Sequence, residues 1–210
     1  LAVAGAAMLQ GCTAQYLVAD SYPVADGDWA VVHSAAGGVG LLLTQLVRAR
    51  GGHVLATTST EEKAELARAA GADDVVVGYD GFPERVRERS GGAGAAVVYD
   101  GVGRTTFAAG LTALRPTGRM ILYGAASGQP DPLDLPQLAA HGSLYVQRPT
   151  LGTYTRTPDM LRERAAAILD MVAAGRLDVR IGARFPLADA RQAQEYLESR
   201  RSTGKILLLP

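Results

Sequence analysis

The residues with the clearest chemical meaning lie at positions 29–40, where a short apolar run ends in a loop of small residues. The spacing Ala35-x-Gly37-x-x-Gly40 matches the pattern G-x-G-x-x-G with alanine in the first position. A small first residue permits a tight turn, Gly37 lets a pyrophosphate approach the backbone, and Gly40 lets strand and helix pack closely. The helix that follows would direct free N–H groups and its positive dipole end toward the phosphates.

The end of the second apolar run, at 53–57, distinguishes an NAD site from an NADP site. An NAD site has Asp or Glu there to bind the ribose hydroxyls, whereas this chain has Thr-Thr-Ser-Thr-Glu-Glu-Lys at 57–63. A 2′-phosphate would meet the hydroxyl donors of this segment, including Ser59, a helix N-terminus and the Lys63 ammonium, so we predict NADPH. The alternative is a capping box, Ser59-x-x-Glu62, with Lys63 in solvent, and both interpretations can hold together.

Further candidates follow the later strands. Tyr79 comes after the third run, either beside the adenosine or as an ordinary loop aromatic. The strings Asp-Gly-Val-Gly at 100–103 and Tyr-Gly-Ala-Ala at 123–126 end two more runs. Because ligands of doubly wound sheets lie at the carboxyl ends of strands, small residues there would admit the nicotinamide half. Ordinary glycine turns are the alternative.

The sequence gives little support for a metal site or for a catalytic nucleophile. The histidines are His33, His53 and His141, and none lies in an H-E-x-x-H motif or beside a cysteine pair. Cys12 is the single cysteine, so no internal disulfide can form. We expect no metal site, expect His33 to pack beside the loop, and assign no catalytic side chain.

The composition of the 210 residues limits the partners. Lys plus Arg and Asp plus Glu are equal at 21 each, which gives no bulk charge for nucleic acid or a membrane surface. No apolar run has the length of a membrane span, and the single cysteine suits a reducing cytoplasm. The chain begins without Met inside a predicted helix, so we expect a fragment whose upstream part is missing.

Strand and helix patterns alternate, which predicts an α/β fold with a doubly wound parallel sheet of six strands. Strands are expected at 29–33, 53–57, 74–77, 95–100, 119–123 and 144–147, and helices at 1–19, 38–50, 60–70, 84–89 and 105–114. After position 150 come a helix at 158–174 capped by Gly175, a strand at 179–185, a helix at 187–199 and a strand at 205–209. We expect residues 1–150 to form a dinucleotide-binding domain, the helical segment 151–175 to pack on it, and residues 176–210 to return to a second lobe.

Several strings together resemble a known family. They are Ala-Met-Leu-Gln-Gly-Cys-Thr-Ala at 7–14, His-Ser-Ala-Ala-Gly-Gly-Val-Gly at 33–40, Ser-Thr-Glu-Glu-Lys at 59–63, Val-Tyr-Asp-Gly-Val-Gly at 98–103, Gln-Arg-Pro-Thr-Leu at 147–151 and Leu-Glu-Ser-Arg at 197–200. In this order they look like the NADPH:quinone oxidoreductases, the zeta-crystallin-like branch of the zinc-free medium-chain dehydrogenases/reductases. The likeness runs from about Ala6 to Pro210, although the glycine-rich string alone is shared with enoyl reductases.

The resemblance implies a Rossmann domain beside a GroES-like catalytic domain, of which only the tail after about Ile181 would be present. With the strand-end loops, it gives the expected cofactor contacts: Thr13, Ala36, Gly37, Gly38, Val39, Ser59, Lys63, Tyr79, Gly101, Val102, Tyr123, Gly124, Ala125, Arg148 and Arg200. Ser59 stands where relatives often have Gly, and Gly101 where some have Ser. Without the resemblance, the pair Arg200-Arg201 is typical of a solvated helix end.

The activity implied is hydride transfer from NADPH to a quinone. One alternative keeps the cofactor and reduces an activated alkene, such as an enoyl thioester. Another is a nucleotide-binding protein without turnover. The resemblance also implies a homodimer, in which the run at 144–146 would be a sheet edge that pairs across a two-fold axis, or else an interior strand.

Overall fold

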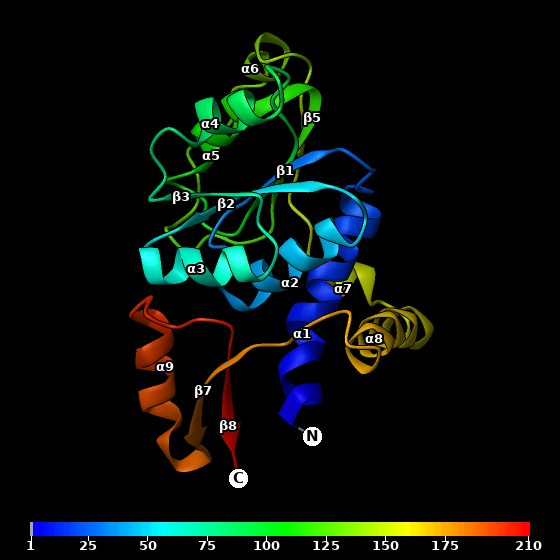
Figure 1. Ribbon diagram of the computed structural model, residues 1–210, viewed down its shortest axis with the longest axis vertical. Helices are drawn as coiled ribbons and strands as arrows, with labels where there is room; N and C mark the ends of the chain where they lie inside the picture. The colour runs from blue at the N-terminus through cyan, green and yellow to red at the C-terminus, as the bar shows by residue number, and fades with distance from the viewer. Residues whose placement is uncertain (1) are drawn as a thin grey trace.

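The structure is a computed structural model that describes residues 2–210. Its centre is a sheet of six parallel strands in the order β3-β2-β1-β4-β5-β6 (Figure 1). The strands are β1 Trp29–Val32, β2 His53–Thr58, β3 Asp74–Val77, β4 Ala95–Asp100, β5 Leu114–Leu122 and β6 Tyr145–Gln147. The strand order reverses between β1 and β4, so the predicted doubly wound sheet of six strands is confirmed.

Helices cover both faces of the sheet (Figure 1). One face packs against α1 Ala2–Tyr16, α2 Gly38–Arg48, α3 Glu61–Ala69 and α8 Pro158–Ala173, and the other against α4 Phe82–Arg89 and α5 Phe107–Ala113. Ala30 and Val32 of β1 face the first layer and Val31 faces the second. Each fully buried aliphatic side chain contributes about 1.5–3 kcal/mol to stability, which holds the sheet rigid between its two helical layers.

The first helix ends earlier than predicted. Residues Leu17–Ser21 form a π-helix instead of continuing α1, with the N–H of Tyr22 donating to the Leu17 carbonyl at 3.0 Å. Contacts from elsewhere hold this wider turn, because Arg164 of α8 pairs with Asp20 at 2.7 Å and Arg119 of β5 donates to the Ser21 carbonyl at 2.6 Å. These partners lie about 100 or more residues away, so the local pattern could not indicate them.

The fifth strand begins earlier than predicted. Leu114 pairs with Ala95 and Arg119 pairs with Val97, so the intervening residues 115–118 bulge out of the ladder. Pro116 and Gly118 are typical of a turn, and the strand was expected only from position 119. Thr117 in this segment has a φ of +60°, which fits the bulge. Two short helices, α6 Pro136–Ala140 and α7 Leu151–Tyr154, flank β6.

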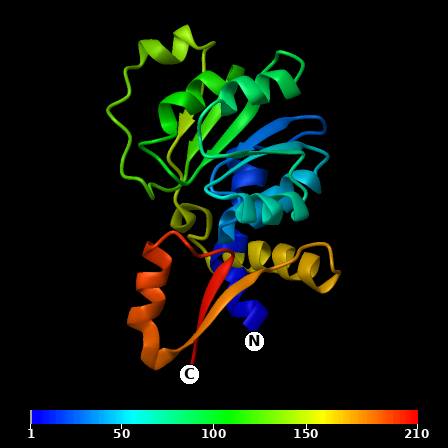
Figure 2. The same cartoon turned by 60° about the vertical axis from the view of Figure 1, so that its left-hand side comes forward.

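The C-terminal part forms a separate sheet of two parallel strands, β7 Ile181–Pro186 and β8 Lys205–Leu209 (Figure 2). Between them, a 3₁₀ turn at Leu187–Asp189 precedes α9 Ala190–Glu198, where one continuous helix was expected. Gly175 ends α8 as predicted: its φ is +66°, and the N–H groups of Gly175 and Arg176 bind the carbonyls of Val172 and Met171. Within residues 2–210, no helix combines the length and the apolar character that a membrane crossing requires.

Candidate functional site

The loop between β1 and α2 is as tight as the glycine spacing predicts. The N–H of Ala35 donates to the Thr57 carbonyl at 3.0 Å, and the N–H of Gly37 donates to the Ser34 carbonyl at 2.9 Å. A Cβ at Gly40 would lie 2.5 Å from the Ser34 carbonyl oxygen and 2.7 Å from the Ala35 Cα. No side chain fits there, so Gly40 is what permits the close approach of helix and strand.

The N-terminus of α2 carries no cap from a side chain. Gly37 is the residue before the first turn, no side chain accepts a hydrogen bond from that turn, and no acidic residue lies within it. The first amide groups of a helix have no carbonyl partner within the helix, so this end presents N–H donors and a positive dipole. Such an end binds anions, and phosphates above all.

The N-terminus of α3 is built differently from the expectation. Thr60, and not Ser59, precedes the helix, and its hydroxyl accepts a hydrogen bond from the N–H of Lys63 at 3.3 Å. The alternative of a capping box at Ser59 and Glu62 is therefore wrong, because Thr60 is the cap and Lys63, not a Glu or Gln, stands at the third position of the helix. This shift leaves the Ser59 hydroxyl outside the cap, and Glu62 is exposed.

Lys63 and Arg200 connect three parts of the chain. The Lys63 ammonium donates to the Arg200 carbonyl at 2.5 Å, and the Arg200 guanidinium donates to the Ala126 carbonyl at 3.2 Å. Burial lowers the pKa of Lys63, while the neighbouring Glu62 raises it. The N–H of Gly204 also donates to the Ala36 carbonyl at 2.9 Å, so the segment before β8 lies along the loop before α2.

These parts enclose a cleft of about 250 Å³ at the carboxyl ends of the strands. Seven of the residues expected to bind a cofactor line it: Ala36, Gly37, Ser59, Lys63, Tyr79, Val102 and Arg200. Five further residues line it that were not among the expected cofactor contacts: Ser34, Thr58, Ala126, Ser127 and Ser202. Ser127 and Ser202 add hydroxyl groups to the lining. Ser127 directly follows the strand-end loop at 123–126, and Ser202 lies two residues after Arg200, so their positions in the sequence could have indicated them.

The other expected residues do not line this cleft: Thr13, Gly38, Val39, Gly101, Tyr123, Gly124, Ala125 and Arg148. Gly38 and Val39 begin α2 beside it. The Thr13 hydroxyl donates to the Leu9 carbonyl at 2.7 Å, and the Arg148 guanidinium donates to the Leu122 carbonyl at 3.0 Å. Both groups therefore already have a partner within the protein.

The loops after β4 and β5 interlock. A Cβ at Gly124 would lie 2.7 Å from the Gly101 carbonyl oxygen, and one at Gly101 would lie 3.0 Å from the ring of Tyr123. Burial raises the pKa of Tyr123, and Asp100 raises it further, so the phenol stays protonated. Glycine at both positions therefore permits the close packing of one loop on the other.

Asp100 holds the first of these loops in place. Its carboxylate accepts hydrogen bonds from the N–H groups of Val102 at 2.6 Å and Gly103 at 2.9 Å, and from the Thr106 hydroxyl at 2.8 Å. Burial raises the pKa of Asp100, and these three donors lower it. The arrangement places Val102 at the wall of the cleft.

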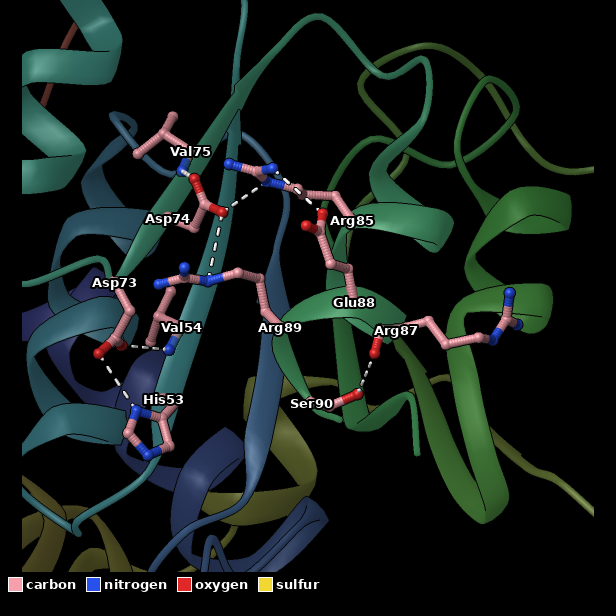
Figure 3. A network of polar contacts seen from close by, with 10 residues as sticks. All are labelled: His53, Val54, Asp73, Asp74, Val75, Arg85, Arg87, Glu88, Arg89 and Ser90. Carbon is pink, nitrogen blue, oxygen red and sulfur yellow. Dashed lines mark hydrogen bonds and ion pairs between the residues drawn. The ribbon is translucent and has the colours of Figure 1, made fainter. Parts of the chain in front are cut away.

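A network of ion pairs and hydrogen bonds lies at the amino ends of β2 and β3, at the end of the sheet opposite to the cleft (Figure 3). Asp73 accepts from the N–H of Val54 at 2.8 Å and lies 3.1 Å from the His53 imidazole, while Asp74 pairs with Arg85 at 2.6 Å. These residues stand where β2 and β3 begin, so the network connects strands and α4 away from the cleft. Among residues 2–210, no three His, Cys, Asp or Glu side chains converge as metal ligands.

Comparison with known proteins gives relatives that are longer than this chain. The chain is 40% identical over 208 residues to a quinone oxidoreductase of Pseudomonas aeruginosa, covering 99% of this chain and 64% of that protein. It is 40% identical over 205 residues to a 2-haloacrylate reductase of a Burkholderia species, covering 97% of this chain and 62% of that protein. The chain thus spans a little under two thirds of the length of these relatives.

Two solved structures with similar folds contain NADPH. A mycobacterial protein complexed with NADPH matches with a TM-score of 0.95 and 46% identity, over 99% of this chain and 65% of that one. The Escherichia coli quinone oxidoreductase complexed with NADPH matches with a TM-score of 0.94 and 38% identity, over 99% of this chain and 65% of that one.

A sequence model of the family described as zinc-binding dehydrogenase matches residues 38–169. The described part of this chain offers no ligand set that would fit the zinc in that description. The match covers more than half of the chain, and the relatives above agree with it in sequence and in fold. The protein therefore belongs to the zinc-binding dehydrogenase family within the medium-chain dehydrogenases/reductases, where its relatives include quinone oxidoreductases.

Proposed function

We propose that the protein binds NADPH in the cleft and takes part in hydride transfer from the nicotinamide to a quinone. The observation that carries this proposal is the uncapped N-terminus of α2, beside a cleft that two cationic side chains, Lys63 and Arg200, help to line. Relatives complexed with NADPH support the cofactor, and relatives named quinone oxidoreductases support the acceptor.

The residues at α2 fit a pyrophosphate. Ala36 and Gly37 form a wall with almost no side chain, and the amide groups of Gly38 and Val39 belong to the uncapped first turn. A Cβ at Gly38 would lie 3.1 Å from the Gln10 side chain and 3.2 Å from the Gly204 carbonyl oxygen. A larger residue there would press on α1 and on the segment before β8, so glycine lets both pack against the start of α2.

The opposite part of the cleft fits a 2′-phosphate. Ser59 has a hydroxyl outside the helix cap, and Lys63 and Arg200 add two positive charges to the lining of the cleft. Tyr79 adds an aromatic side chain. No Asp or Glu ends β2, so no carboxylate at that strand end would bind the free ribose hydroxyls of NAD.

The nicotinamide half would lie along the interlocked loops. We assign to it the residues near strand ends, Gly101, Val102, Tyr123, Gly124, Ala125 and Arg148. Thr13 of α1 is assigned to it from the family resemblance alone. When bound, NADPH supplies the hydride, which is the difficult part of the chemistry. The residues of this chain orient the ring through backbone contact, and the rigid loops exclude water from one side of it.

Direct titration tests the cofactor assignment. NADPH should bind the 210-residue chain with a lower Kd than NADH, since only NADPH carries the phosphate that Lys63 and Arg200 attract. Calorimetry or the fluorescence of the reduced nicotinamide can follow both titrations. Equal affinity for the two nucleotides would remove the 2′-phosphate site, and no binding of either would refute the proposed function.

An activated alkene is a second candidate for the hydride acceptor, because one relative is named a 2-haloacrylate reductase. Steady-state rates with a quinone and with an enoyl thioester or a haloacrylate separate the two. We expect the quinone to react faster. We also expect slow turnover by this chain, because more than a third of the length of each of these relatives has no counterpart in it. A chain that binds NADPH without turnover would support the nucleotide-binding alternative.

The arrangement of the parts is also a proposal. We propose that residues 1–150, with the helical segment 151–175, form the nucleotide-binding unit, and that 176–210 belong with a second, GroES-like lobe.

The strand β6 lies at the edge of the sheet, so the interior-strand alternative is wrong. Tyr145 and Val146 are exposed on that edge, and we propose that it pairs with a second copy of the chain in a homodimer.

A further inference from the structure

His33 is a polar side chain with no contact to solvent. It follows the last residue of β1, directly before the loop that precedes α2, and it is 0% exposed. Its Nδ1 lies 2.8 Å from the Thr57 hydroxyl, while its Nε2 is buried without a hydrogen-bond partner among residues 2–210. A buried nitrogen without a partner destabilises a fold, so packing alone would favour an apolar residue here.

The ring of His33 packs edgewise against two aromatic rings. The centroid of Phe82 is 4.7 Å away and that of Tyr79 is 5.9 Å away, with interplanar angles of 85° and 81°. Phe82 is itself completely buried, whereas Tyr79 is partly exposed and lines the cleft. No hydrogen bond to another side chain or backbone group fixes the Tyr79 side chain within residues 2–210.

We propose that His33 is a positioning residue, which holds the Tyr79 ring at the wall of the cleft in the place that the adenosine end of the cofactor requires. The inference rests on the proposed function, because it assumes that a nucleotide occupies the cleft. Three neighbouring strands take part: Thr57 of β2 orients the imidazole after β1, and the imidazole supports the tyrosine after β3. Burial lowers the pKa of His33 to about 3, so the ring stays neutral at physiological pH.

The polar side chain has a specific use in this arrangement. The hydrogen bond between His33 Nδ1 and the Thr57 hydroxyl fixes the rotation of the imidazole about its last side-chain bond, which no apolar residue at position 33 would reproduce. An edge-to-face pair depends on ring orientation, so the fixed imidazole in turn limits the orientations of Tyr79. A leucine at position 33 would fill the space and leave Tyr79 free to turn away from the cleft.

A double-mutant cycle on cofactor affinity tests the proposal. NADPH is titrated into the wild-type chain, His33→Leu, Tyr79→Leu and the double variant. We expect His33→Leu to raise the Kd about two- to tenfold when Tyr79 is present, the range for an aromatic pair. In the Tyr79→Leu background, the same change should alter the Kd less than about twofold. Equal effects in both backgrounds would mean that His33 acts on the fold and not through Tyr79.

Two further variants keep the test decisive. Phe82→Leu is the matched control, because it removes the other ring neighbour of His33; it should lower the melting temperature and leave the Kd within about twofold. Thr57→Val removes the hydrogen bond at nearly constant volume and should weaken NADPH binding in the same direction as His33→Leu. If His33→Leu fails to fold, an unchanged Kd for Thr57→Val overturns the proposal. A wild-type chain that binds no NADPH would instead refute the proposed function.

Discussion

Lys63 is the residue on which the preference for NADPH depends in our proposal. Its ammonium now donates to the Arg200 carbonyl at the wall of the cleft. Lys63→Glu should weaken NADPH binding about ten- to a hundredfold, the size of a lost hydrogen bond to a charged group, with a much smaller effect on NADH. Arg68→Glu, the same charge change at the other end of α3, is the matched control in the titrations. Equal weakening of both nucleotides would contradict the assignment.

His33 also gives the protein a defined response to acid. Its pKa falls from about 6.5 in the unfolded chain to about 3 in the folded one, because burial disfavours the charged imidazole. Between these values only the unfolded state binds the proton. The contribution of His33 to the free energy of unfolding is therefore fully present above about pH 6.5. It decreases as the pH falls toward 3, by at most about 1.4 kcal/mol per pH unit.

Urea unfolding at pH 7.5 and pH 5.5 measures this contribution. The free energy of unfolding of the wild-type chain should decrease by about 1.4 kcal/mol from His33 alone. His33→Asn should lose that part of the decrease, since an amide does not titrate. Identical pH dependence in the two proteins would show that the imidazole is protonated without penalty in the folded state.

At the scale of elements, the amino ends of β2 and β3 are fastened by Asp73. It accepts the N–H of Val54 at 2.8 Å and pairs with Arg48 at 3.0 Å (Figure 3 shows its strand contacts). Asp73→Asn should lower the free energy of unfolding by about 1–2 kcal/mol, because an amide binds these donors more weakly. Thermal unfolding and NADPH titration together check this: stability should fall while the Kd stays unchanged.

A matched control comes from the same network. Glu88 pairs with Arg85 at 3.2 Å, and its side chain is 69% exposed. Glu88→Gln should change stability by less than about 0.5 kcal/mol, since solvent screens exposed pairs. If Asp73→Asn weakened NADPH binding as strongly as it lowered stability, the amino ends of the strands would not be independent of the cleft at their carboxyl ends.

At the scale of the whole molecule, the two edge strands of the sheet differ in our proposal. The edge at β6 should join two copies of the chain, and the edge at β3 should not. Val146→Lys places a charge on the first edge and should convert a dimer to a monomer in sedimentation velocity. Val77→Lys makes the same change on the second edge, where Val77 is 45% exposed, and should leave the dimer intact. A wild-type chain that stays monomeric at high concentration would refute the dimer.

The sequence by itself determined the parts of the protein that depend on neighbouring residues. Glycine spacing at 35–40 predicted the tight turn, and the alternation of apolar runs with helical patterns predicted six parallel strands. The strands at Asp74–Val77 and Ala95–Asp100 have the predicted bounds. These features follow from backbone sterics and from the periodicity of burial, which act within a few residues.

Only the tertiary structure decided the rest, because the forces involved join residues far apart in the chain. The π-helix at Leu17–Ser21 is held from Arg119 and Arg164, and the bulge before Arg119 appears only when β5 pairs with β4. The local pattern of Arg200 favoured a solvated helix end, yet its guanidinium reaches Ala126, 74 residues earlier. The cleft exists because the segment before β8 packs on the loop before α2, and no local periodicity encodes that contact.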